Sequence, residues 1–283
     1  MMSAELVRNS VAVCIILLAC SEAIPIIACA DMERTRHAEV VPKRFGSTSL
    51  RMSEAVRSIH WTADGRRIIA VDENNSVRAW SIHSWELEKT MFRSGILNVE
   101  VFADSERIAA GSDLEILIVE VQTRKVLCRI EDEKARDLRH FALLNRGKRL
   151  VANLGRDAIG IWDTATGRRL HVFDEYKKIH LITAAPDGAR VAVVSDGMTL
   201  YLIESETGQE VWKRKTDCDI RNIAYSKDGK RLATISADHA VRIWDAASGV
   251  VLHSFTTNTL NEMFVSVVLS PDNEKVYIGE SNG

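Results

Sequence analysis

The feature that most constrains this sequence is a repeat with a period of about 41 residues. A turn of the Asp-Gly type recurs at intervals of 40 to 44 residues, at Asp64-Gly65, Asp104-Ser105, Arg146-Gly147, Asp187-Gly188, Asp228-Gly229 and Asp272-Asn273. A second marker keeps nearly the same spacing, at Trp80, Val119, Trp162, Ile203 and Trp244. Two independent markers with one period indicate a single structural unit that is copied along the chain.

The copy between residues 220 and 255 shows what that unit is. Four short β-rich runs, separated by turn residues, lie at Ile220–Tyr225, Arg231–Ser236, Ala240–Asp245 and 250–255. Consecutive strands joined by tight turns form an antiparallel sheet. One such sheet alone leaves both faces in water, so each copy must pack against its neighbours.

Four strands repeated at this period are typical of a β-propeller blade. We therefore predict an all-β fold, a β-propeller of four-stranded antiparallel blades with five full blades plus a partial sixth, over residues 56–283. The sixth copy offers two strands, at 264–269 and 274–279. We expect an open or poorly closed ring, unless residues 31–55 or a strand from a partner close it.

The tripeptides Ile161-Trp162-Asp163 and Ile243-Trp244-Asp245 give the repeat a family resemblance, because they resemble the WD40-repeat family of propellers. The resemblance implies a buried set of hydrogen-bonded side chains in each blade. Its members here would be Thr234, Asp238 and Trp244, with Trp162 and Trp80 at the equivalent tryptophan position. The Gly-His pair that completes the set in the family is absent from every copy.

Composition and motifs argue against several functions. The formal net charge is −2, and the basic clusters are short, so we expect no nucleic-acid partner. None of the eight histidines stands at metal-ligand spacing, and there is neither an HExxH motif nor a GxSxG motif. We therefore predict no catalytic residue, no metal site and no cofactor.

The resemblance implies a non-catalytic scaffold that holds a protein or peptide on one rim of loops. The alternative is an exported propeller enzyme or cofactor binder, similar to quinone-dependent dehydrogenases or lactonases. Such a site needs polar side chains that converge from successive blades. The sequence offers only scattered candidates for it, such as Arg156 and Asp238.

The first 30 residues differ from the repeats and predict export to the periplasm or the extracellular space. An apolar run follows Arg8, and Ala28-Cys29-Ala30 has the small-residue pattern of a signal-peptide cleavage site. Residues 1–30 are thus a signal peptide or an N-terminal anchor, and lipid on Cys20 or Cys29 is a third reading. Residues 31–55 are a linker or a ring-closing segment, whose candidate strands are Val40-Val41 and residues 47–52. Cys128 and Cys218 follow this region and are expected to be free thiols.

Overall fold

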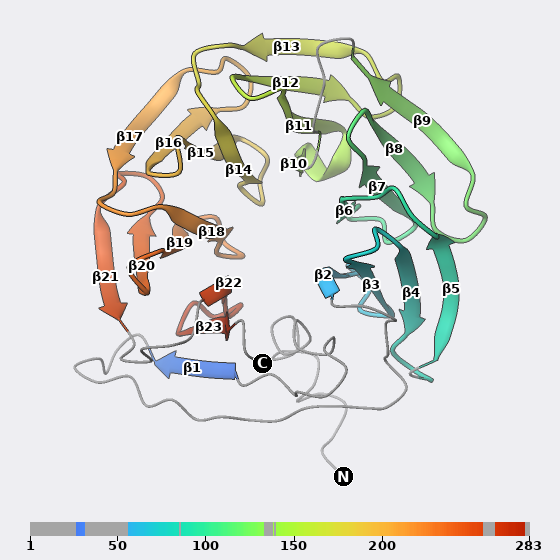
Figure 1. Ribbon diagram of the computed structural model, residues 1–283, viewed down its shortest axis with the longest axis horizontal. Helices are drawn as coiled ribbons and strands as arrows, with labels where there is room; N and C mark the ends of the chain where they lie inside the picture. Colours follow the sequence, from blue (N-terminus) through green and yellow to red (C-terminus); the bar gives the residue numbers. More distant parts are fainter. Residues whose placement is uncertain are drawn as a thin grey trace.

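The fold is a ring of β-sheets arranged around a central axis (Figure 1). The computed structural model describes residues 27–31, 56–84, 86–132, 138, 140–256 and 264–280. Within those residues the regular structure is β-strand, apart from one 3-10 turn, η1 (Asn145–Gly147). Over the same ranges, no helix has the length and apolar character that crossing a bilayer requires.

Five four-stranded antiparallel sheets form the full blades, in chain order. Their strands are, in blade 1, β2 (Val56–Trp61), β3 (Arg67–Asp72), β4 (Val77–Ser81) and β5 (Leu87–Phe92); in blade 2, β6 (Asn98–Val101), β7 (Arg107–Gly111), β8 (Glu115–Glu120) and β9 (Val126–Glu131); in blade 3, β10 (Phe141–Leu144), β11 (Arg149–Leu154), β12 (Ala158–Asp163) and β13 (Arg169–Phe173); in blade 4, β14 (Ile179–Ala184), β15 (Arg190–Ser195), β16 (Thr199–Glu204) and β17 (Glu210–Lys215); and in blade 5, β18 (Ile220–Tyr225), β19 (Arg231–Ser236), β20 (Ala240–Asp245) and β21 (Val251–Thr256).

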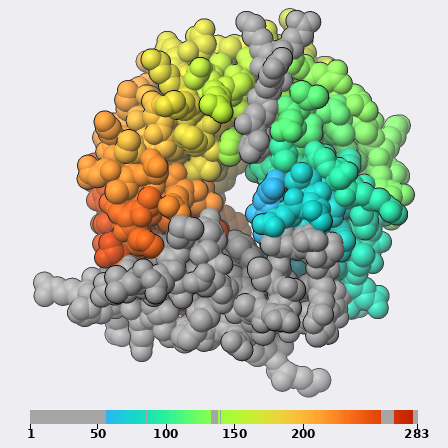
Figure 2. All heavy atoms as spheres, in the orientation of Figure 1, coloured from blue at the N-terminus to red at the C-terminus, as the bar shows by residue number. Residues whose placement is uncertain are grey.

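The predicted propeller is therefore confirmed, and so are the strands of the best copy. Three strands of blade 5 begin and end at the residues expected from the sequence, while the fourth begins one residue later, at Val251. Each blade runs outward from its first strand, beside the axis, to its fourth strand at the circumference (Figure 1). Figure 2 shows an opening at the centre of the ring.

The sixth sheet contains two strands from the last copy and one from far upstream. As predicted, the copy supplies β22 (Phe264–Leu269) and β23 (Lys275–Glu280). The third strand is β1 (Ile27–Asp31), which pairs antiparallel with β23, from Ile27 opposite Gly279 to Asp31 opposite Lys275. Apart from Asp31, this strand precedes the segment 31–55, which was expected to be either a linker or a ring-closing segment. Val40-Val41 and residues 47–52 lie outside the described residues.

Apolar side chains between neighbouring blades form the core. The second and third strands of each blade are buried on both faces, because each face packs against another sheet. This explains why the run from Ile116 to Val119 is continuously apolar rather than alternating. One cluster joins blades 1 and 2 through residues such as Ile69, Val99 and Ile108, and equivalent clusters lie between later pairs of blades.

A second kind of contact joins the blades at the circumference. The turn between the third and fourth strands of one blade packs against the fourth strand of the blade before it. Gly249, at φ +67°, lies so close to Trp212 that a Cβ atom would come within 2.7 Å of the indole ring. The Trp212 indole donates a hydrogen bond to the Ala246 carbonyl at 3.0 Å, and Arg214 Nε donates to the Gly249 carbonyl at 2.9 Å. Blades 4 and 5 are thus joined by a packed and hydrogen-bonded turn.

Candidate interaction rim

The antiparallel strand order divides the loops of the propeller between two rims. Turns between first and second strands, and between third and fourth strands, lie at one end of the ring, which we call the Asp-Gly rim. Turns between second and third strands lie at the other end, together with the connections between blades. We call this end the connection rim. A partner that contacts one rim meets a different set of loops from a partner that contacts the other.

On the Asp-Gly rim, the repeated aspartates accept hydrogen bonds from residues of their own turns. Asp228 accepts hydrogen bonds from the Ser226 hydroxyl at 2.6 Å and from the Lys230 backbone N–H at 3.0 Å. The hydrogen bond from Ser226 is the main reason that the pKa of Asp228 is lowered. Asp272 repeats the arrangement with the Ser270 hydroxyl and the Glu274 backbone. These carboxylates stabilise turns, so their recurrence does not indicate a catalytic site.

The tryptophan set of blade 5 forms two separate pairs. The Trp244 indole donates to the Thr234 hydroxyl at 2.9 Å, and both residues are buried. Asp238 pairs instead with Arg242, at 2.6 Å, and this hydrogen bond is the main cause of its lowered pKa. The two pairs lie on the neighbouring strands β19 and β20 and on the turn between them, and Thr234 stands opposite Arg242.

Trp162 and Trp80 occupy the same place in blades 3 and 1, and both are buried. In blade 3, Ala152 stands where blade 5 has Thr234, and Ala70 does so in blade 1. Trp162 packs over Gly160, where a Cβ atom would come within 2.1 Å of the ring. These two tryptophans are therefore held by apolar packing rather than by a hydroxyl partner.

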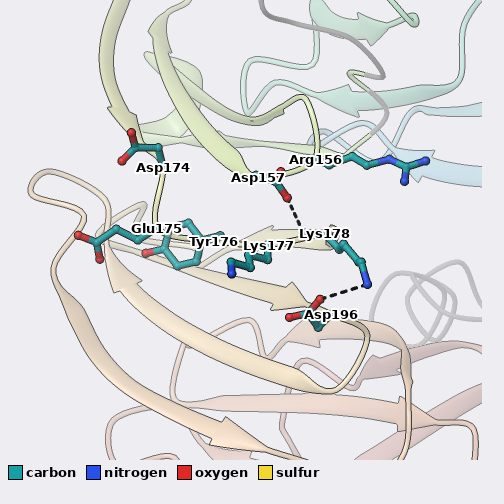
Figure 3. A pocket seen from close by; sticks show the side chains of 8 residues that line it. All are labelled: Arg156, Asp157, Asp174, Glu175, Tyr176, Lys177, Lys178 and Asp196. Atoms are coloured by element: carbon teal, nitrogen blue, oxygen red, sulfur yellow. Dashed lines mark hydrogen bonds and ion pairs between the residues drawn. The ribbon is translucent and has the colours of Figure 1, made fainter.

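The connection rim carries a pocket of about 510 Å³ between blades 3 and 4 (Figure 3). Three segments line it: the second-to-third turn of blade 3, the connection that leads from β13 to β14, and the second-to-third turn of blade 4. Their lining residues are Arg156, Asp157, Asp174, Glu175, Tyr176, Lys177, Lys178 and Asp196. Tyr176 is buried, and the other seven are exposed.

Backbone hydrogen bonds hold the connection in place from both sides. On the side of blade 3, the Ile179 N–H donates to the Arg156 carbonyl at 2.7 Å. The Lys178 N–H donates to Asp157 Oδ1 at 3.0 Å. On the side of blade 4, the Asp196 N–H donates to the carbonyls of Lys177 and Lys178, each at 3.1 Å. The pocket is therefore built on a loop that two blades fix, which lowers the entropy lost when a ligand binds.

Tyr176 forms the buried part of the pocket. Its ring packs edge-on against Tyr201, with centroids 5.2 Å apart, and it belongs to the apolar cluster between blades 3 and 4. Burial, reinforced by Glu175 and Glu210, raises the pKa of Tyr176 to about 12. The phenol is therefore uncharged at neutral pH. The pocket thus has a buried aromatic ring at its base, and its seven exposed charged residues form the rim around it, which we call the charged lip.

The inner strands of blades 1 and 2 hold two further titratable groups at equivalent places. His60 on β2 and Glu100 on β6 each stand four residues before the repeated aspartate. Burial lowers the pKa of His60 to about 4 and raises that of Glu100 to about 7. Over the described residues, no group of three or more His, Cys, Asp or Glu side chains is placed to hold a metal ion. These two groups therefore lie outside any recognisable metal centre.

Comparison with known families agrees with the repeat geometry. The model of the WD domain, G-beta repeat family matches residues 47–81, which cover blade 1 through its third strand. The model of the anaphase-promoting complex subunit 4 WD40 domain matches residues 185–269, which run from the end of blade 4's first strand through β22. The chain carries WD40 repeats. The expected family resemblance is thereby confirmed by matches that include Trp80-Ser81 of blade 1, Ile203-Glu204 of blade 4 and Trp244-Asp245 of blade 5.

Curated relatives resemble this WD40 propeller over most of its length. Protein tipD of Dictyostelium discoideum is 25% identical over 233 residues, which are 77% of this chain and 37% of tipD. Apoptotic protease-activating factor 1 of Rattus norvegicus is 23% identical over 218 residues, 76% of this chain and 14% of that protein. The chain thus spans less than two fifths of the length of either relative.

The structure separates the two candidates for an enzymatic site. Arg156 lies at the pocket between blades 3 and 4, whereas Asp238 is paired with Arg242 on the equivalent turn of blade 5. Blade 4 stands between those two turns. Arg156 was among the scattered candidates that the sequence offered, whereas residues 174–178 were not among the predicted sites. The only signal in that loop was its order of charges, Asp-Glu-Tyr-Lys-Lys. Cys128 and Cys218 are both free, as expected.

Proposed function

We propose that this WD40 propeller is a non-catalytic scaffold that binds a protein or peptide partner at the pocket on the connection rim. One observation supports this above the rest: the pocket is a concave site formed by loops of two blades, with a buried aromatic residue beneath a charged lip. Concave sites with an apolar interior and a few placed polar groups are the usual form of binding sites. The Asp-Gly rim offers less, because its carboxylates are committed to their own turns.

Site-specific photo-cross-linking in the native host tests the proposal. A photoreactive residue replaces Lys177 on the connection rim or, as the matched control, Lys227, which is exposed on the Asp-Gly rim. We expect a discrete adduct from position 177 alone, whose partner then binds the purified wild-type protein in solution. Adducts from position 227 alone would place the partner on the other rim. Turnover of a small substrate, lost on substitution of Arg156 or Asp238, would reject the scaffold itself.

We also propose that the first 30 residues direct export to the periplasm or the extracellular space. The support is the apolar run after Arg8 and the Ala28-Cys29-Ala30 motif. This motif coincides with β1, so cleavage after Ala30 would remove that strand apart from Asp31. Sequencing the N-terminus of the protein isolated from its host decides the question. Recovery of the intact Met1 terminus from a cytosolic fraction would contradict export.

A further inference from the structure

The charges of the pocket are sorted by their distance from the ring axis. The connection leaves the outer strand β13 with Asp174 and Glu175, and it reaches the inner strand β14 with Lys177 and Lys178. Figure 3 shows the two acids on one side of Tyr176, and both lysines with Arg156 on the other. The pocket is thus acidic toward the circumference and basic toward the channel.

Part of this charge is already neutralised within the pocket. Lys178 Nζ lies 3.8 Å from Asp196 Oδ1, and Asp157 accepts the Lys178 backbone N–H. Asp157 accepts a backbone N–H, which does not neutralise its carboxylate, so this group adds a negative charge at the basic end. The other four charged groups are Arg156 and Lys177 toward the channel, and Asp174 and Glu175 toward the circumference. Among the residues that the structure describes, none of these four side chains makes an ion pair. Two exposed cations and two exposed anions are therefore available to a ligand at opposite ends of one pocket.

We infer that the pocket binds an extended peptide segment that carries an acidic and a basic side chain a few residues apart. Its acidic side chain lies toward Arg156 and Lys177, and its basic side chain lies toward Asp174 and Glu175. Asp174 and Lys178 are four residues apart, so the loop spans at most about 13 Å. An extended peptide covers that distance in about four residues. This inference rests on the proposed function and specifies the partner's chemistry.

Other ligand classes fit the pocket less well. A phosphate-rich ligand would meet Asp174 and Glu175 at one end, and a polycation would meet Arg156 and Lys177 at the other. A peptide segment that carries both charges can form an ion pair at each end of the pocket, while the side chain between the two charges lies over Tyr176. Because the lip is exposed, these pairs provide selectivity more than affinity, and salt should weaken them.

Selection from a displayed library of random octapeptides tests the inference. The wild-type propeller is compared with two double variants, Arg156→Glu with Lys177→Glu, and Asp174→Lys with Glu175→Lys. A third variant, Lys227→Glu with Lys230→Glu, makes the same change in net charge as the first, but on the Asp-Gly rim. All six substituted positions are exposed, so the folds should survive, which far-UV circular dichroism and Tm confirm beforehand.

We expect the wild type and the Asp-Gly-rim variant to select peptides with an acid and a base three or four residues apart. The first variant should lose the preference for the acid, and the second the preference for the base. The best wild-type peptide should bind each pocket variant at least tenfold more weakly in fluorescence anisotropy. The inference would be overturned if the selected peptides lacked such a charge pair, or if the pocket variants selected the same charge pair as the wild type. A photo-adduct at position 177 with a segment lacking that charge pair would reject the inference and leave the scaffold function standing.

Discussion

The hydrogen bond between Trp244 and Thr234 shows that the stability of a repeated tryptophan depends on the residue beside it. A buried indole N–H without an acceptor carries its full desolvation cost, which a neutral hydrogen bond only just offsets. Blades 1 and 3 carry an alanine, Ala70 or Ala152, in place of the threonine, and Trp162 also packs against Gly160. The same marker residue is therefore supported by different chemistry in different blades.

Replacement of Thr234 by valine keeps the shape of the side chain but removes the acceptor. We expect the free energy of unfolding to fall by about 1–3 kcal/mol, because the Trp244 N–H stays buried without a partner. Urea denaturation followed by tryptophan fluorescence measures the change. Leu114→Ala, at a side chain that is 67% exposed, is the control and should shift stability by less than about 0.5 kcal/mol. Equal effects at the two positions would show that the hydrogen bond contributes nothing.

Glu100 predicts a dependence of stability on pH. Burial raises its pKa from 4.5 to about 7, so the folded state favours the protonated form. The stability that the protonated Glu100 side chain provides is fully present below pH 4.5 and is lost as the pH rises to about 7. Glu100→Gln should therefore stabilise the protein at pH 8, by up to about 3 kcal/mol, but hardly at pH 4.5. Chemical denaturation at both pH values, with exposed Glu106→Gln as the control, measures this. A gain of the same size at both pH values would contradict it.

At the scale of the element, the turn that joins each blade to the one before is the informative unit. Gly249 and Gly65 have nearly the same φ, +67° and +68°, but a Cβ atom at Gly249 would meet Trp212 and one at Gly65 would meet nothing within 4 Å. The two glycines thus share a backbone requirement and differ in a packing contact. Comparing them isolates what the contact between blades contributes.

We predict that Gly65→Ala costs about 1 kcal/mol of stability, from the left-handed backbone alone. Gly249→Ala should cost a further 1–3 kcal/mol or so, because the added methyl group overlaps the Trp212 ring. Differential scanning calorimetry of both variants gives the comparison. If the two lose the same amount, the turn does not pack tightly against blade 4.

The strands could be predicted from the sequence, whereas the pocket could not. Turn residues and alternation are local, and six copies of one turn give six independent observations of the same unit. The pocket depends on which loops meet in space, and the Asp-Glu-Tyr-Lys-Lys order of its loop 174–178 does not recur in the other connections between blades. The pairing of β1 with β23 was missed for a related reason. It joins residues from opposite parts of the chain, and no turn residue marks such a contact.

At the scale of the whole molecule, β1 determines whether the sixth sheet has two strands or three. Without it, the outer edge of β23 presents backbone N–H and C=O groups that attract other strands. Cleavage at the proposed export site would remove residues that the sixth sheet uses, because that site lies inside β1. The cleaved protein would then keep β22 and β23 but lose the third strand of the sheet.

Two shortened chains separate these outcomes. A chain that begins at Asp31 lacks β1 almost entirely, whereas one that begins at Glu22 keeps it. We expect the shorter chain to lose about 2 kcal/mol or more, the net value of a few backbone hydrogen bonds, and to associate as its concentration rises. Urea denaturation and light scattering measure both effects. Identical behaviour of the two chains would show that β1 contributes nothing to the ring.

The contact between β1 and β23 also sets an order of events during synthesis. Ile27 leaves the ribosome long before Gly279, its partner, has been made. Each blade can pair its own strands as soon as they emerge, because its contacts are local. β1 has no partner until the last described strand is complete, so the sixth sheet is the last to acquire its full set of strands. Cleavage at the proposed site would have that interval in which to act before β1 is paired, so translation time would influence how many chains keep the third strand.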